Sequence, residues 1–509
     1  MNINVIDLFA GPGGLGEGFF SFKNSKNKYP YQGICSVEMD KHAHSTLTLR
    51  AFYRQLKKNN ITPPDEYFEY IAGSSAVPYN ENTKKYWNRA NKETLNLELG
   101  LDEHSDLDIF KTLKEKHRKK LESKPTVLIG GPPCQAYSLV GRARNKGKKD
   151  YIPENDQRHF LYKEYLKIMQ TFSPDIFIME NVKGMLSSKI NGGAVFSKII
   201  DDLQNCGEGY SLYSLKTGEQ FNKENTDPKD FILKSEDYGI PQCRHRVIIL
   251  GIKHGGRDLP RTVTPLNKQS QVSVKTALSG LPDVRSIFSN RSKFYKDNTY
   301  KNWKEFIVKG ISELIVKESN LDKKLVVALK VEIRKLEESA ELFNKLETDY
   351  PLQQKSDKFL EFVCVSEGEK IRSHQPRPHM DADLLRYFFC SVFNQSMGRN
   401  ARAEDFPESL APNHKNWESG KFVDRFKVQS YGKPSSTITS HISKDGHYFI
   451  HPEPSQCRSL TVKEAARLQT FPDSYVFMGQ RTNQFHQVGN AVPPLLARQI
   501  SEIVYKLIK

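Results

Sequence analysis

The sequence is poor in cysteine and has no long apolar run. Its seven cysteines are scattered, odd in number and never spaced as C-x-x-C, which argues against a disulfide-built domain and a zinc module and predicts reduced thiols. No apolar segment approaches the roughly 20 residues needed to cross a bilayer. The first residues read directly as a strand rather than as a secretory signal. We therefore expect a cytoplasmic protein with no membrane attachment and no metal.

The charge is strongly one-sided. Lysine and arginine number 76 and aspartate and glutamate 60, giving a formal net charge of +16 and a pI near 9.2. Such an excess favours a polyanionic partner, most often nucleic acid, although a basic surface can also serve solubility alone. The 509 residues allow two or three domains.

A glycine-rich turn lies between a predicted strand and a predicted helix near the start of the chain. Residues 3–9 are typical of a buried strand, the turn 11–16 reads Gly-Pro-Gly-Gly-Leu-Gly, and a helix is expected from Glu17. The pattern G-x-G-x-x-G in this context indicates a nucleotide-like cofactor. Glu38 follows a second predicted strand, where a carboxylate can accept hydrogen bonds from both hydroxyls of a ribose. The motif alone leaves NAD, FAD and S-adenosylmethionine open.

Cys134 lies in the turn Gly-Gly-Pro-Pro-Cys-Gln-Ala-Tyr at 130–137, directly after the apolar, β-branched segment 124–129. Two prolines fix the backbone and two glycines permit close approach, so the thiol is presented at the carboxyl end of a strand, where α/β sheets bind ligands. This arrangement suits a nucleophile. An inert core cysteine is the alternative. Five cations at 142–149 follow, as a loop that can close over phosphates or simply lie exposed.

Two later segments bring further polar groups to the same region. The predicted strand 175–179 ends at Glu180, which can face one cavity with Cys134 or can cap the next helix. Arg244 and Arg246 open the predicted strand 247–252, and surface arginines are the simpler interpretation. To reach the same rim, these arginines require that strand to run antiparallel to its neighbours.

These segments resemble the signature blocks of DNA (cytosine-5)-methyltransferases, and they occur in the family's order. The resemblance covers most of residues 1–252 and 434–509. The matching blocks are Asp7-Leu8-Phe9-Ala10-Gly11-Pro12-Gly13-Gly14, Gly131-Pro132-Pro133-Cys134-Gln135, Glu180-Asn181-Val182, Gln242-x-Arg244-x-Arg246, Arg458-x-Leu460-Thr461-x-x-Glu464-x-x-Arg467-Leu468-Gln469-x-Phe471-Pro472 and Gln487-Val488-Gly489-Asn490-Ala491-Val492-Pro493.

The resemblance implies a mechanism that the chemistry of cytosine explains. Carbon 5 is a weak nucleophile until a thiolate adds to carbon 6, the role of Cys134. Glu180 then donates or shares a proton at N3 of the cytosine, and Arg246 holds O2 of the same base. Arg244 pairs with phosphate or steadies the glutamate. The methyl donor is S-adenosylmethionine, and the target base must be rotated out of duplex DNA. The implied cofactor contacts are Phe9, Gly11, Gly13, Gly14, Glu38, Met39, Asp108, Ile109, Leu161, Asn490 and Val492.

The implied fold is α/β, with the Rossmann-like mixed sheet of S-adenosylmethionine-dependent methyltransferases containing one antiparallel strand and a smaller inserted target-recognition domain. We expect the catalytic domain over 1–262 and 484–509 and the inserted domain over 263–483. Within the variable interval 253–457, periodicity predicts a charged helical segment near 302–348, and strands are expected from 422 onward. A short third strand end is expected at 106–110.

Alternatives remain at this stage. A similar catalytic set occurs in enzymes that methylate cytosine in transfer RNA, a non-catalytic DNA- or cofactor-binding relative would keep the same blocks, and the glycine motif alone would fit a nicotinamide dehydrogenase. The absence of appended regulatory modules favours a monomeric prokaryotic modification enzyme of a restriction-modification system, with any cognate endonuclease acting separately.

Overall fold

The protein is described by a computed structural model covering residues 2–101, 103–133, 161–190, 193–342, 358–364, 371–413, 417 and 425–509. The chain divides into two compact units. Unit 1 comprises residues 1–270, 476–479 and 491–509, and unit 2 comprises residues 271–475 and 480–490. These units are observed divisions of the structure, whereas the functional domains expected at 1–262, 263–483 and 484–509 stay predictions.

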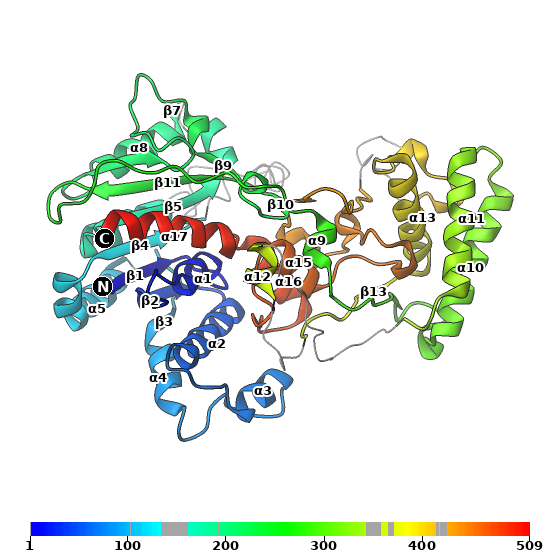
Figure 1. The fold of residues 1–509 in the computed structure, drawn as a ribbon, viewed down its shortest axis with the longest axis horizontal. Helices are drawn as coiled ribbons and strands as arrows, with labels where there is room; N and C mark the ends of the chain where they lie inside the picture. Colours follow the sequence, from blue (N-terminus) through cyan, green and yellow to red (C-terminus); the bar gives the residue numbers. More distant parts are fainter. Residues whose placement is uncertain are drawn as a thin grey trace. The chain divides into compact units, whose positions relative to one another are not determined.

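Unit 1 is built on a mixed sheet in the order β3-β2-β1-β4-β5-β11-β8, with β9 paired to β11 (Figure 1). The neighbours from β3 to β5 are parallel, whereas β11 is antiparallel to β5, β8 and β9. The expected α/β fold with one reversed strand is therefore confirmed. The strands are β1 (Ile3–Leu8), β2 (Tyr31–Glu38), β3 (Thr94–Asn96), β4 (Thr126–Gly130), β5 (Ile176–Val182), β8 (Tyr210–Ser214), β9 (Ile232–Lys234) and β11 (His245–Lys253).

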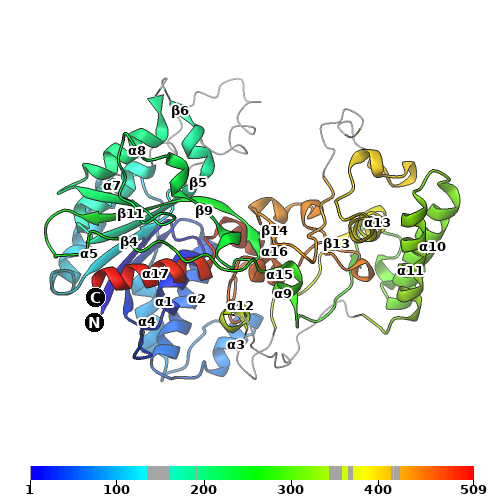
Figure 2. The same ribbon diagram turned by 45° about the horizontal axis from the view of Figure 1, so that its top comes forward.

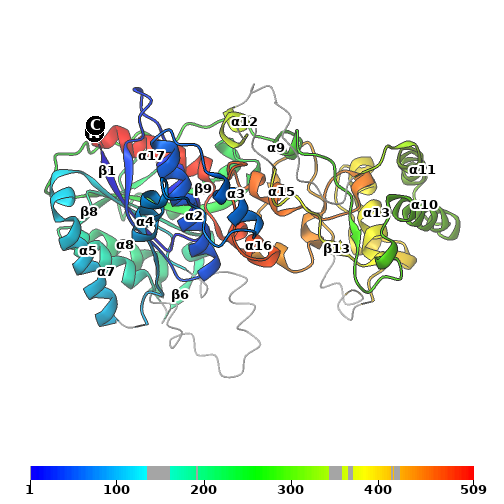
Figure 3. The same cartoon turned by 90° about the horizontal axis from the view of Figure 1, so that it is seen from below.

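Helices cover both faces of this sheet, which explains why every residue of β1 and β4 is buried. Helices α5, α7 and α8 pack on one face, and their apolar residues share a core with β1, β2, β5 and β11. Helices α1 and α17 pack together on the other face (Figure 3). The helices of unit 1 are α1 (Gly14–Ser21), α2 (Lys41–Lys58), α3 (Asp65–Ala72), α4 (Lys84–Glu93), α5 (Glu103–Ser123), α7 (Leu161–Phe172), α8 (Val195–Gln204) and α17 (Pro494–Ile508).

The regular secondary structure of unit 2 is mainly helical, and its named strands are two residues long (Figure 2). A core of leucines, isoleucines and aromatic residues joins α10, α11 and α13. The elements of unit 2 are α9 (Val274–Leu278), α10 (Tyr300–Lys317), α11 (Lys323–Glu338), α12 (Lys358–Val363), α13 (Asp381–Met397), α15 (Val462–Leu468), α16 (Arg481–Asn490), β12 (Ile287–Phe288), β13 (Pro378–His379) and β14 (Ser435–Ser436).

Two expectations about secondary structure were wrong. Residues 106–110 lie inside α5 rather than in a strand, and Phe110 and Leu113, three positions apart, both face the core. Between residues 425 and 460 the described chain forms isolated bridges and 3-10 turns, with β14 as its one named strand, so of the expected strands and turns the extended strands are missing. Prolines and turn residues interrupt the alternating pattern there, because proline cannot donate to a ladder.

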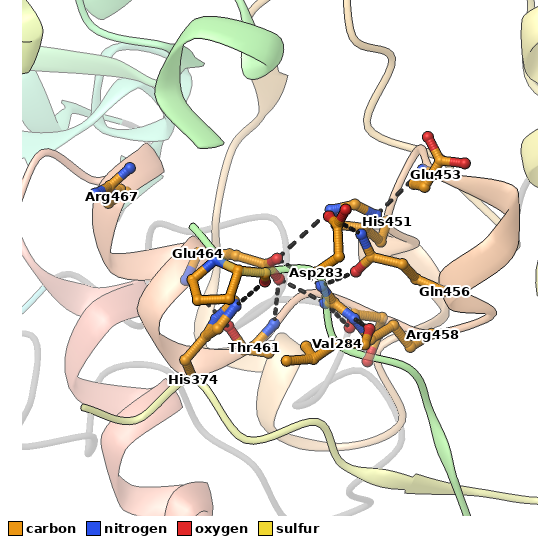
Figure 4. Close-up of polar contacts among 12 residues, drawn as sticks. Asp283, Val284, His374, His451, Glu453, Gln456, Arg458, Thr461, Glu464 and Arg467 are labelled. Carbon is orange, nitrogen blue, oxygen red and sulfur yellow. Dashed lines mark hydrogen bonds and ion pairs between the residues drawn. The ribbon is translucent and has the colours of Figure 1, made fainter. Parts of the chain in front are cut away.

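A buried network of charged and polar groups lies near the carboxyl end of unit 2 (Figure 4). Both terminal nitrogens of Arg458 bond to the carboxylate of Glu464 at 2.7 Å. Glu464 also accepts the backbone N–H of Thr461 at 2.7 Å, closing a capping box at the start of α15. Burial alone would raise the pKa of Glu464, but Arg458 and His451 beside it hold that pKa well below its usual range.

The same network ties distant segments of unit 2 together. Arg458 Nε donates to the carbonyl of Val284 at 2.8 Å, and His374 lies 3.0 Å from the hydroxyl of Thr461. Gln456 donates to Asp283 at 2.7 Å. The block that resembled the family between 458 and 472 is therefore the organising element of this unit, because it connects segments near 283, 374 and 458.

Replacing Arg458 with methionine should lower the free energy of unfolding of this unit by about 3–5 kcal/mol, because the Glu464 carboxylate would stay buried without its partner. Urea or thermal denaturation followed by circular dichroism measures this loss. Arg402→Met is the matched control, since Arg402 lies 3.9 Å from Glu404 at an exposed site and should change stability by less than about 1 kcal/mol. Equal effects of the two substitutions would contradict the assigned role.

Candidate active site

The glycine-rich turn between β1 and α1 adopts a left-handed backbone at alternate positions. The φ angles are 55° at Phe9, 58° at Gly11 and 95° at Gly13. Positive φ is rare for a residue other than glycine, so Phe9 marks a strained position of the kind found at functional sites. No atom lies within 4 Å of where a side chain would begin at Gly11, so a ligand can approach its backbone closely.

Glu38, at the end of β2, lies beside this turn. One oxygen of its carboxylate accepts the N–H of Gly11 at 2.8 Å, and the other accepts the N–H of Asp40 at 2.8 Å. Burial raises the pKa of Glu38, and these two hydrogen bonds partly offset that rise. The predicted ribose-binding carboxylate is thus fixed next to the glycine turn.

Asn96 is a residue of this region that the sequence did not single out. It ends β3, and its amide donates to the carbonyls of Glu38 and Met39, both at 2.9 Å. Met39 is 55% exposed. Its predicted contact with the cofactor stays a prediction. The three-residue strand β3 is too short to produce a recognisable pattern, which is why Asn96 was missed.

The carboxyl-terminal segment forms part of the same region of unit 1. A side chain at Gly14 would begin 2.3 Å from the carbonyl oxygen of Val492 and 3.1 Å from the side chain of Ala491. Only glycine therefore fits there, at the start of α1. Val492 lies against the glycine turn as a cofactor contact would. Asn490 ends α16 and belongs to unit 2.

The remaining predicted cofactor residues are less clearly grouped. Asp108 lies on the exposed side of α5 and pairs with Lys111 at 3.5 Å, one helical turn away. Ile109 packs against the core of unit 1. Leu161 begins α7 and lies close to Gly100. The helix found at 106–110 removes the strand end on which the assignment of Asp108 and Ile109 relied, and their cofactor role stays a prediction.

Glu180 and Arg246 form the clearest polar pair at the carboxyl end of the parallel strands. Arg246 Nε lies 2.8 Å from the Glu180 carboxylate, and both side chains are only partly buried. The antiparallel register sets Ile248 opposite Glu180 and Arg246 opposite Val182, so the reversed strand delivers the arginine to the glutamate. The juxtaposition that the sequence predicted is present.

The turn that leads to Cys134 is held against the same pair of strands. A side chain at Gly131 would begin 2.8 Å from the second oxygen of Glu180, and the Asn181 amide donates to the carbonyl of Pro132 at 3.4 Å. Cys134 follows two positions later and lies outside the described residues, as does the basic segment 142–149. The described chain therefore passes directly beside Glu180 just before it reaches Cys134.

Arg244 lies behind this pair rather than at the surface. Its side chain is buried, and burial together with the charge of Arg246 lowers its pKa well below the usual value, while Glu180 opposes that change. The carbonyl of Arg244 accepts two hydrogen bonds from Ser235. This position favours support of the glutamate over a contact with phosphate.

Asp7, in β1, is a buried acid beneath the glycine turn. Its side chain is 1% exposed, and neither carboxylate oxygen has a hydrogen-bond partner among the described residues. One oxygen lies 2.7 Å from where a side chain at Gly16 would begin. Burial raises the pKa of Asp7 to about 8, with Arg54 opposing the rise and Glu38 and Glu93 adding to it. The neutral acid is the favoured form at neutral pH.

The described residues lack two kinds of feature. They contain no helix long and apolar enough to span a bilayer. They also contain no cluster of three or more histidine, cysteine or acidic side chains able to hold a metal ion.

Comparison with known proteins gives a consistent set of relatives. The model of the C-5 cytosine-specific DNA methylase family matches residues 68–506. The type II methyltransferase M.Bpa9945I of Bacillus paralicheniformis is 30% identical over 99% of both chains. M.DdeI of Desulfomicrobium norvegicum, also a type II methyltransferase, is 24% identical over 98% of this chain and 88% of its own.

A solved structure shares the fold at lower sequence similarity. It is a candidate DNA modification methyltransferase encoded within a prophage of E. coli. It has a TM-score of 0.51 and 20% identity and covers 99% of both chains.

The buried acid at position 7 makes stability depend on pH. Because the pKa of Asp7 is raised from near 4 to about 8 on folding, its contribution is fully present below pH 4 and is lost as the pH rises through 8. Asp7→Asn should therefore gain stability relative to the parent between pH 5 and pH 8, by at least about 1 kcal/mol. Denaturant unfolding at a series of pH values measures this difference, with Asp258→Asn, at an exposed site, as control. If the free energy of unfolding varies with pH in the same way for Asp7→Asn and the parent, this role of Asp7 is contradicted.

Proposed function

This chain belongs to the family of C-5 cytosine-specific DNA methylases, and from that premise we propose which of its residues perform the methyl transfer and from which donor. The chain is a DNA (cytosine-5-)-methyltransferase. The proposal concerns Cys134 as nucleophile, Glu180 and Arg246 as the groups on the cytosine ring, and S-adenosylmethionine as donor. The observation that carries it is the 2.8 Å pair between Arg246 and Glu180 beside the turn that leads to Cys134.

The nucleophile is Cys134. Its thiolate adds to carbon 6 of the cytosine, which moves electron density onto carbon 5. Carbon 5 would then take the methyl group of the donor, after which a base removes the proton from carbon 5. Elimination breaks the bond between sulfur and carbon 6 and restores the free thiolate and the aromatic ring. Because the ring face must meet the sulfur, the cytosine has to leave the stack of double-stranded DNA, at a cost of a few kcal/mol.

Glu180 and Arg246 act on the polar edge of the ring. Glu180 donates or shares a proton at N3 as negative charge develops, and the Arg246 guanidinium donates to O2. Their mutual ion pair fixes both side chains before the substrate arrives, which lowers the cost of orienting them. Arg244, buried behind them, is a positioning residue.

The residues around the glycine turn suit S-adenosylmethionine. Open space at Gly11, the neighbouring Glu38 carboxylate and the exposed Met39 together form a cradle for a nucleoside. When bound, S-adenosylmethionine supplies an electrophilic methyl group. Glu38 would accept the ribose hydroxyls, and Phe9 and Val492 would border the site. Asn490 is included among the proposed cofactor contacts because of its position in the family's final block.

The cellular role follows from the relatives, which are named type II methyltransferases. We propose that the chain acts as a monomer in the cytoplasm of a prokaryotic cell and belongs to a restriction-modification system, with a cognate endonuclease acting separately. Bisulfite sequencing of DNA from cells expressing the protein tests the activity, because 5-methylcytosine resists conversion, and it also reveals the target sequence. Conversion of every cytosine would contradict the proposed activity.

Cys134→Ala should abolish methyl transfer, because no other group adds to carbon 6, while binding of S-adenosylmethionine is retained. Glu180→Gln should lower kcat by about 10²- to 10⁴-fold, the usual contribution of a general acid. Transfer of tritiated methyl groups to duplex DNA measures both, with tRNA as a parallel substrate. A covalent complex with 5-fluorocytosine DNA should form with the parent and not with Cys134→Ala. Full transfer by Cys134→Ala would remove this residue from the mechanism.

Glu38→Gln should weaken binding of S-adenosylmethionine by about 10- to 100-fold, the value of one or two hydrogen bonds to a charged group. Isothermal titration calorimetry measures the dissociation constant. Glu208→Gln, at an exposed site in the same unit, is the control and should bind as the parent does. An unchanged constant for Glu38→Gln would place the ribose elsewhere.

A further inference from the structure

Helix α11 of unit 2 has one buried face and one outward face of unusual composition. Leu325, Leu329, Ile333 and Leu336 are buried in the core shared with α10 and α13. On the opposite side, Lys323, Val327, Lys330 and Arg334 follow one another at helical spacing, with Lys324 and Val331 on the adjoining row. We define these six residues as the outer face of α11.

The cations of the outer face have no acidic partners. Lys323, Lys324, Lys330 and Arg334 form no ion pair with any described residue, whereas Lys335, at the edge, pairs with Glu332 at 2.7 Å. Surface helices commonly alternate glutamate and lysine four positions apart. Here the positions between the cations are occupied by valines, which leaves the positive charges uncompensated.

The exposed valines make a simple solvated surface an inadequate explanation. Val327 is 61% exposed and Val331 is 43% exposed, and valine is a weaker helix former than glutamate, lysine or glutamine. Neither residue belongs to the buried core of this unit. Like the lysines and the arginine of the outer face, the two valines carry no negative charge.

The distribution of charge along α11 also opposes its own helix dipole. Lys323 and Lys324 occupy the first turn, where acidic residues are stabilising, and no acidic residue lies within that turn. Glu337 and Glu338 lie in the last turn, where cations are favoured and Lys335 is the one cation. Only Asp322, which caps the helix by accepting two backbone N–H groups, offsets the lysines. Residues that lower helix stability in this way are expected at functional surfaces.

We propose that the outer face of α11 binds the phosphate backbone of the DNA substrate, independently of sequence. Four unpaired cations along about 16 Å of helix complement a duplex that carries one negative charge per roughly 1.7 Å. Lysines, which predominate here, act as point charges on phosphates, whereas base recognition favours arginine, asparagine and glutamine. A second copy of the same face is disfavoured because it would oppose cations to cations. The proposal rests on DNA being the substrate.

The first test removes the charges without removing the helix. The variant carries glutamine at four positions of the outer face, and a control variant carries glutamine at four exposed cations of α5. The replaced residues are Lys323, Lys324, Lys330 and Arg334 in the test variant and Lys114, Lys116, Lys119 and Lys120 in the control.

Fluorescence anisotropy against duplexes with and without the target sequence, at several salt concentrations, measures the effect. The test variant should bind both duplexes about 10- to 100-fold more weakly, and its slope of log K against log salt should fall by about 2 to 4, near one for each phosphate that is no longer neutralised. Its kcat at saturating DNA should match that of the parent. An unchanged slope, or a weakening equal to that of the α5 control, overturns the inference.

The second test separates DNA binding from a structural role. Val327→Glu and Val331→Glu each set an acid four positions from a lysine, at Lys323 and Lys335, and should leave the melting temperature unchanged or raise it. Both should nevertheless weaken binding to either duplex, because the new carboxylate repels phosphate. Weaker binding with a lowered melting temperature overturns the inference in favour of a structural role. A parent dimer that dissociates on either substitution, seen by sedimentation equilibrium, overturns it in favour of self-association.

A parent protein that methylates no DNA would refute the assigned activity itself. A parent that methylates DNA normally, together with an outer-face variant that binds like the parent, would refute only the role of α11. The two failures are therefore distinguishable in the same set of measurements.

Discussion

The reversed direction of β11 is the constraint on which the meeting of Arg246 and Glu180 depends. All other strands from β3 to β5 run parallel, so their carboxyl ends deliver the glycine turn, Glu38 and Glu180 to one edge of the sheet. An arginine near the start of a further parallel strand would lie at the opposite edge. Because β11 pairs antiparallel with β5, Arg246 reaches Glu180 instead. One inverted pairing thus converts two separate sequence motifs into a single charged pair.

Unit 2 is organised differently, because a buried ion pair rather than a sheet connects its segments. Arg458 and Glu464 form two hydrogen bonds with each other, and Arg458 also donates to Val284, which is far away in the sequence. Removing either partner is costly, while the pair itself contributes modest net stability. Such a network favours one arrangement of a unit whose strands are too short to specify it.

The sequence allowed the sheet and much of the site to be predicted, because buried parallel strands are short apolar runs and the polar residues at their ends follow immediately. The antiparallel course of β11 followed from requiring Arg246 to reach Glu180. Residues 106–110 were misassigned because two apolar residues three apart belong to a helix as readily as to a strand end. Asn96 could not be found, since its role depends on pairing between β2 and β3 rather than on any local pattern.

The packing of Val492 against Gly14 has a consequence for biosynthesis. The backbone that closes over the start of α1 comes from a segment nearly the whole chain away, so the first turn of the protein stays unfinished until residue 492 has left the ribosome. Pairings of such high sequence separation form late, since the intervening loop must close first. A nascent polypeptide can therefore form its strands before this contact exists, and only a chain synthesised past residue 492 can close the start of α1.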